Sequence, residues 1–150
     1  MKKKILFILL LALVSSCDDE ISSPVPNAEV NIKLYLNHED MNLTGKLSYT
    51  VFTSRRKESD KIGYGGVLVI NGFGDTPHVN LYAFDLSCPV EVSRTVRLVP
   101  DNEGHCVCPK CGTKYDIGYG NGRPVSGEGT SFMRSYRVVN TGNSTYLVKN

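Results

Sequence analysis

The sequence predicts an all-β protein, a small antiparallel sandwich or barrel with two loops that carry cysteines. Apolar and polar residues alternate in short runs, glycine-rich turns separate the runs at intervals of about 8 to 12 residues, and no stretch shows a sustained helical stripe. The 150 residues suffice for one domain. Because the chain has no tryptophan, the core must be built from aliphatic residues, tyrosine and phenylalanine.

The first expected strand covers residues 29–36, where apolar and polar side chains alternate, and the second covers residues 46–53 in the same way. Residues 54–63 are rich in charge and are expected to form a solvated loop. Further strands are expected at residues 64–71, 79–86, 95–99, 113–117, 132–139 and 144–148, with turns at residues 71–75, 118–122 and 140–143.

The start of the chain is expected to lie outside the folded domain. Residues 1–16 combine three lysines, an apolar run and two serines, which is typical of a signal peptide. The segment Leu13-Val14-Ser15-Ser16-Cys17 resembles the lipobox of bacterial lipoproteins, which implies cleavage before Cys17 and acylation of that cysteine. An ordinary secretory signal that happens to contain a cysteine is the alternative. Residues 17–27 would then tether a domain of residues 28–150 to the membrane.

Charge and the residues after the anchor bear on partners and location. Removing residues 1–16 takes three lysines from 17 basic residues and leaves 14 against 15 acidic ones, so the net charge falls from +2 to about −1. Nothing in that balance favours nucleic-acid binding. We expect a lipid-anchored protein of the cell envelope, at the outer membrane or the cell surface. The acidic residues 18–20 resemble the surface-export signal of some lineages, although in others aspartate there marks inner-membrane retention.

Two segments hold the other four cysteines. The first is YAFDLSCPVE (residues 82–91), and the second is CVCPKCGTKYDI (residues 106–117). Together with RPVSGEGTSFMRSYRV (residues 123–138) they resemble a Rieske domain, over about residues 65–150. The resemblance implies a small antiparallel β fold whose tip is formed by two cysteine-bearing loops, with residues 28–62 as additional strands.

The resemblance also shows where the ligand set departs from the family. Each Rieske loop gives one cysteine and one histidine to a 2Fe–2S cluster. The cysteine positions fall on Cys88 and Cys108, whereas the histidine positions are occupied by Val90 and Cys111. Valine has no electron pair to donate, and Glu128 stands where the family has a proline. A standard Rieske cluster is therefore not expected.

Three alternatives remain for the cysteines. A disulfide from Cys88 to Cys108 or Cys111, or free thiols, needs no cofactor and is favoured for an exported protein. If Cys106 also converges on this group, four thiolates suit an all-cysteine 2Fe–2S centre or Zn²⁺. The corresponding functions are a non-catalytic structural or interaction module without the usual cluster, an electron-transfer protein, and a zinc-stabilised module. The protein partner of such a module stays open.

Other candidate residues carry less chemistry. The three histidines are expected to be polar loop residues, and His105 lies outside the family's histidine position. Asp85 matches an aspartate of the Rieske strand and is expected to be structural. The Cys108–Cys111 pair leads into a strand, whereas thioredoxin-type motifs open a helix. We therefore expect no enzyme, and electron transfer rather than an oxygenase if the protein is redox-active.

Overall fold

The computed structural model describes residues 22–75 and 77–150. Over these residues the protein is all-β and antiparallel, as predicted, with one short 3-10 helix. Residues 1–16 and Cys17 lie outside the described residues, so the signal peptide and the lipidation stay predictions. Within the described ranges, no helix has the length and apolar character needed to cross a membrane.

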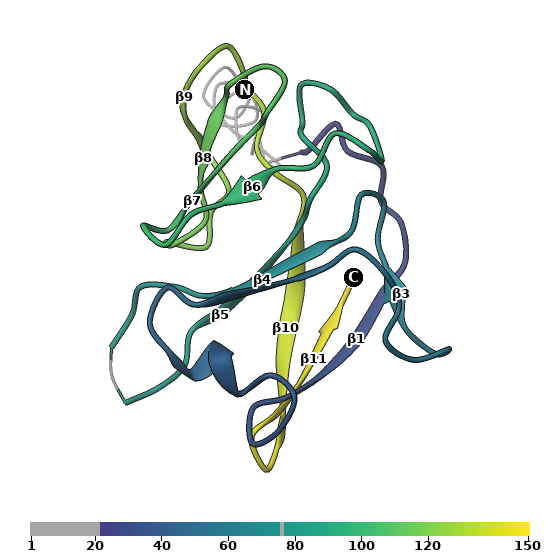
Figure 1. Cartoon of the computed structure of the whole chain (residues 1–150), viewed down its shortest axis with the longest axis vertical. Helices are drawn as coiled ribbons and strands as arrows, with labels where there is room; N and C mark the ends of the chain where they lie inside the picture. Colours follow the sequence, from purple (N-terminus) through teal and green to yellow (C-terminus); the bar gives the residue numbers. More distant parts are fainter. Residues whose placement is uncertain (1–21, 76) are drawn as a thin grey trace, which may run out of the picture.

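Eleven strands form two sheets, of seven and four strands (Figure 1). The larger has the order β2-β4-β5-β10-β11-β1-β3, and the smaller has the order β6-β7-β8-β9. In chain order the elements are β1 (Val30–Tyr35), η2 (Met41–Thr44), β2 (Tyr49–Phe52), β3 (Lys61–Ile62), β4 (Val67–Asn71), β5 (Leu81–Asp85), β6 (Val99–Pro100), β7 (His105–Val107), β8 (Lys114–Asp116), β9 (Pro124–Ser126), β10 (Ser135–Gly142) and β11 (Thr145–Lys149).

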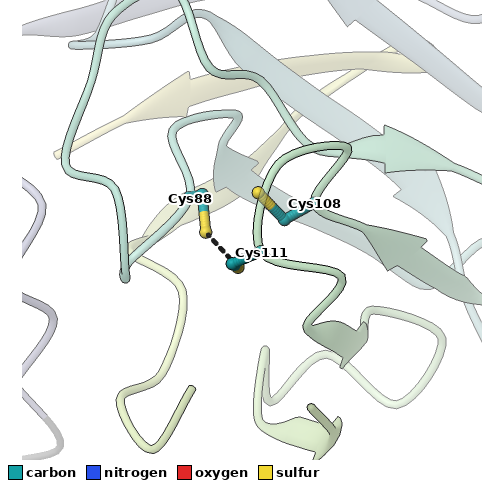
Figure 2. A group of neighbouring side chains, drawn as sticks. All are labelled: Cys88, Cys108 and Cys111. Atoms are coloured by element: carbon teal, nitrogen blue, oxygen red, sulfur yellow. Dashed lines mark hydrogen bonds between the residues drawn. The ribbon is translucent and has the colours of Figure 1, made fainter. Parts of the chain in front are cut away.

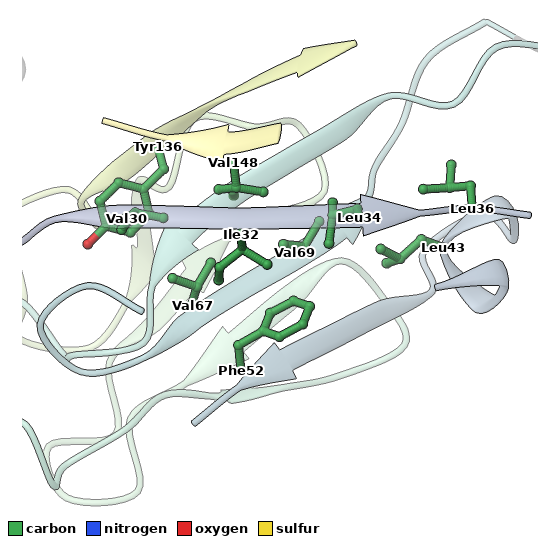
Figure 3. Close-up of a cluster of buried hydrophobic side chains, with 11 residues drawn as sticks. Val30, Ile32, Leu34, Leu36, Leu43, Phe52, Val67, Val69, Tyr136 and Val148 are labelled. Atoms are coloured by element: carbon green, nitrogen blue, oxygen red, sulfur yellow. The ribbon is translucent and has the colours of Figure 1, made fainter. Parts of the chain in front are cut away.

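Strand β10 turns the larger sheet back on itself. Its first residues pair with β5, and the stretch from Arg137 onward pairs with β11. The two halves of the sheet therefore face each other and enclose one apolar core, shown in Figure 3. Ile32 and Leu34 of β1 are fully buried there against Val67 and Val69 of β4. This barrel-like closure explains why alternate residues of β1 had to be apolar.

Strand β4 is buried on both faces and separates two cores. Val67 and Val69 belong to the core inside the larger sheet, whereas Leu68 and Ile70 pack in a second core with Phe84. That second core also takes side chains from β7 and β8 of the smaller sheet. Strands β4 and β5 thus lie between the smaller sheet on one side and β1, β10 and β11 on the other (Figure 1).

Several short elements differ from the expected ones. The second strand begins only at Tyr49, because a 3-10 turn precedes it and Leu47 adopts a left-handed φ of 58°. Of the strand expected at residues 95–99, Arg97 forms an isolated bridge with Ser87 and Val99 begins β6. β3 lies inside the expected charged loop, and β7 and β9 were not expected. Strands of two or three residues contain too few alternations to be recognised.

The last residues of the expected tether are packed against the domain. Val25 is fully buried, and the guanidinium of Arg134 donates hydrogen bonds to the carbonyl oxygens of Ser23, at 3.0 Å, and Val25, at 2.6 Å. The Asn150 side chain donates to that of Asn27 at 2.6 Å. We call residues 22–27 the N-terminal strap. The packed part of the chain therefore extends beyond residues 28–150.

Candidate metal centre

The first cysteine loop follows β5 and is held by a buried carboxylate. Asp85 is fully buried at the end of β5, and its Oδ1 accepts the backbone N–H of Ser87 at 2.8 Å. The carbonyl oxygen of Cys88 then accepts the N–H of Val92 at 2.9 Å, which closes a tight turn. Asp85 thus fixes the point at which the loop leaves the sheet and where Cys88 lies.

The second loop joins β7 to β8 and is closed in the same manner. The carbonyl oxygen of Cys108 accepts the N–H of Gly112 at 3.0 Å, and the N–H of Cys108 donates to the carbonyl of Thr113 at 2.9 Å. Gly112 has a φ of 71°, a conformation that side chains other than glycine rarely adopt. Each loop therefore begins with a cysteine whose carbonyl is bonded to an N–H four residues on.

Three sulfur atoms meet between the two loops. The Sγ atoms of Cys88, Cys108 and Cys111 all lie within 4.8 Å of one another, and those of Cys88 and Cys111 are 3.7 Å apart (Figure 2). Cys88 and Cys108 are buried, whereas Cys111 is partly exposed. The group therefore has two candidate ligands inside the protein and one at its surface.

Cys106, the fourth candidate ligand, does not join this group. Its thiol lies 3.5 Å from the Sδ atom of Met133, and both residues are buried in the second core. The expectation assumed an extended strand through Cys106 and Cys108, in which alternate side chains share a face. β7 ends at Val107, so Cys108 already belongs to the loop and the alternation no longer applies.

A third segment packs on the two loops. Thr113 Oγ1 accepts the N–H of Gly129 at 3.0 Å and the thiol of Cys111 at 3.3 Å. A Cβ atom at Gly129 would come within 3.0 Å of Val90 and 2.8 Å of the Tyr115 hydroxyl, so only glycine allows this approach. Val90, the position that the Rieske resemblance assigns to a histidine, remains 40% exposed.

An ion pair fastens the same loops at the surface. Lys110 of the second loop contacts the carboxylate of Glu91 in the first. The hydrogen bond to Glu91 raises the pKa of Lys110. Sequence analysis missed this pair and the role of Thr113, because neither has a signal within its own segment.

Burial and hydrogen bonding divide the thiols by acidity. Burial raises the pKa of Cys88 to about 11, which disfavours its thiolate. Burial acts in the same direction on Cys111, but hydrogen bonding with Thr113 and with the neighbouring thiols outweighs it and lowers the pKa of Cys111. Metal ligands are thiolates. A cation between the sulfurs would stabilise the thiolate form of Cys88, which burial alone disfavours.

The sulfur distances bear on the chemical alternatives. A disulfide requires about 2.05 Å between sulfurs, whereas the described cysteines are all unpaired and the sulfurs of Cys88 and Cys111 are 3.7 Å apart. In a tetrahedral site with Zn–S bonds of about 2.3 Å, the sulfurs lie about 3.8 Å apart. The separation of Cys88 and Cys111 therefore fits two ligands of a single tetrahedral ion.

The same geometry does not fit a 2Fe–2S cluster. Such a cluster needs four protein ligands, two on each iron. Val90 donates nothing, and Cys106 is turned toward Met133, so the described residues supply three thiols at this tip. These three also lie close to one another, as ligands of one ion do, whereas ligands on two irons point away from each other across the cluster.

Comparisons with known proteins add no assignment. No protein-family model matches the chain, and no curated protein matches it either. The interpretation of the site therefore rests on its ligand chemistry and its geometry.

Proposed function

We propose that the chain is an exported Rieske-like lipoprotein that lacks the usual cluster ligands and acts as a non-catalytic structural or interaction module. In this module Cys88, Cys108 and Cys111 hold one metal ion, zinc by ligand chemistry, which joins the two loops. The observation that carries the proposal is the meeting of three sulfurs within 4.8 Å, drawn from two loops.

The arrangement of the sheets supports the Rieske-like part of the proposal. A small sheet packs against β4 and β5 of a larger one, and the two cysteine loops follow β5 and β7. The chain order of loops and strands is the one that the sequence resemblance implies. Thr113 and Gly129 bring the third family segment onto the loops as well.

Zinc suits this site better than a redox metal. Zn²⁺ does not change its oxidation state and accepts four tetrahedral ligands from sulfur, nitrogen or oxygen. Three thiolates and one exogenous ligand, such as water beside the partly exposed Cys111, would complete that shell. With Cys88 and Cys108 buried, the ion would act as a cross-link rather than as a reaction centre.

A disulfide between Cys88 and Cys111 is the second candidate, because their sulfurs are only 3.7 Å apart and exported thiols oxidise. Closing a loop of about 20 residues stabilises a protein by about 3 kcal/mol in the chain-entropy model. The disulfide would fasten the same loops but would leave Cys108 without a role, which is why we place it second.

Metal and thiol analysis separates these candidates. We expect the protein purified under anaerobic and aerobic conditions to contain one zinc per chain, no iron, and all of its thiols after denaturation. Cys88→Ser should lose the zinc. Cys106→Ser is the matched control, because Cys106 is equally buried but lies outside the group, and it should retain the ion.

Two other outcomes would contradict the zinc site. Two irons per chain with visible absorption would indicate an electron-transfer protein. A metal-free protein that has lost two thiols, with Cys88 and Cys111 in one cross-linked peptide, would establish the disulfide. The lipid anchor has a separate test, since palmitate should label the protein in cells but not its Cys17→Ala variant.

A further inference from the structure

A second group of potential metal ligands lies in the turn between β6 and β7. Asp101 and Glu103 lie in this turn and His105 begins β7, and one donor atom from each lies within 4.8 Å of the other two. The group consists of two carboxylates and one imidazole, and it shares no residue with the cysteine group. Its donors are nitrogen and oxygen, so its chemistry differs from that of the three thiols.

Backbone hydrogen bonds build the shape of this turn. Oδ1 of Asp101 accepts the N–H groups of Glu103 and His105, each at 2.9 Å, and the N–H of Asp101 donates to the carbonyl of His105 at 2.8 Å. Gly104 between them has a φ of 86°, which glycine adopts without strain. The three side chains are therefore brought together by the main chain, and Oδ2 of Asp101 takes no part in these bonds.

The imidazole supplies an observation independent of the cluster itself. Nδ1 of His105 is buried and, among the described atoms, has no hydrogen-bond partner. The nearest carboxylate oxygen, Oδ2 of Asp101, lies 3.9 Å away, which is too far for a hydrogen bond. A buried nitrogen without a partner is costly and calls for an unseen ligand or ion. A cation between Nδ1 and the carboxylates would satisfy it.

We propose that Asp101, Glu103 and His105 bind one divalent metal cation of the kind that takes nitrogen and oxygen ligands. One imidazole and two carboxylates are a donor set used for zinc and for other first-row divalent ions. The Nζ atom of Lys114 lies 3.9 Å from Oδ2 of Asp101 and offsets part of the negative charge. Two carboxylates and one ammonium still leave the site net negative, so a divalent cation is attracted.

Manganese distinguishes the Asp101, Glu103 and His105 group from the cysteine group, because Mn²⁺ prefers oxygen and nitrogen donors over thiolates. The protein is used as purified, with any metal at the cysteine group left in place. It is titrated with Mn²⁺ while the electron paramagnetic resonance signal of the free ion is recorded. We expect one Mn²⁺ per chain with a sub-millimolar dissociation constant. Glu103→Gln and His105→Gln should each weaken binding by about tenfold or more.

The controls fix the location of the ion. Glu103 is exposed, so its replacement removes a ligand without disturbing the core. His38→Gln alters an exposed histidine elsewhere and should leave binding unchanged. Lys114→Gln should tighten binding several-fold, because it removes a neighbouring positive charge.

Three results would overturn the proposal. Absence of Mn²⁺ binding in the intact protein is the first. The second is binding that survives both Glu103→Gln and His105→Gln. The third is binding that Cys88→Ser abolishes, which would place the ion at the cysteine group. Loss of zinc in Cys88→Ser with Mn²⁺ binding retained would show that the two sites are separate.

Discussion

The hydrogen bond from Tyr136 to Asp85 links the larger sheet to the first cysteine loop, and Tyr136→Phe removes it without changing the shape of the side chain. The hydroxyl lies 2.7 Å from Oδ2 of Asp85, and Tyr136 is only 7% exposed. The same carboxylate also accepts the N–H groups of Tyr64, Gly65 and Ser87. After the substitution the Asp85 carboxylate still accepts hydrogen bonds from three backbone N–H groups, so its buried charge remains partly satisfied.

The expected cost follows from this arrangement. A hydrogen bond to a charged group contributes about 1.5 to 3 kcal/mol, and the remaining donors place the loss near the lower part of that range, at about 2 kcal/mol. For a chain of this size that corresponds to a fall in Tm of about 8 °C. Asp85→Asn should cost more, about 3 kcal/mol of unfolding free energy. The NH₂ group of asparagine cannot accept the hydrogen bonds that one carboxylate oxygen of Asp85 now accepts.

Urea denaturation and thermal unfolding measure these losses. Tyr119→Phe is the matched control, because it removes the same hydroxyl from a side chain that is 67% exposed. In the Asp85→Asn background Tyr136→Phe should cost less than it does alone, since the two residues share one interaction. A Tm change no larger than that of Tyr119→Phe would refute the reasoning, as would strict additivity of the two substitutions.

Three further predictions concern the loops. In metal-free protein at pH 7, iodoacetamide should modify Cys111 before Cys88, because Cys111 is partly exposed and its pKa is lowered whereas burial raises that of Cys88; equal rates in peptide mapping would contradict this. Gly129→Ala should cost about 1 to 3 kcal/mol and reduce zinc content, since its Cβ would crowd Tyr115; unchanged melting and zinc would argue against it. Val92→Gly should stabilise by about 1 kcal/mol in urea, because Val92 has a φ of 45°; a loss would mean that its packing matters more.

The parts of the fold that sequence predicted are the strands with long apolar patterns. β1 alternates over six residues and β4 is a continuous apolar run followed by Asn71, and the apolar positions of both fall where the structure buries them. The predicted meeting of Cys88 with Cys108 and Cys111 depended on the Rieske resemblance, because residues from separate segments have no shared periodicity. The structure brings these three together.

The features that sequence left out depend on where short elements end. Whether Cys106 joins the other thiols is decided by the end of β7 at Val107, and no pattern in a three-residue strand marks that point. The approach of His105 to Asp101 requires the turn at Gly104 and was likewise not predicted, since the sequence predicts His105 to be a polar loop residue. It is instead half-buried in β7.

The N-terminal strap has a mechanical consequence. Arg134 holds the carbonyl oxygens of Ser23 and Val25, and it directly precedes β10, so the start of the described chain is bonded to the larger sheet. A pulling force applied through the preceding residues would therefore be transmitted into β1 and β10, whose ladders with β11 resist it in shear. The small sheet with the second cysteine loop lies outside that path and would keep its geometry under tension.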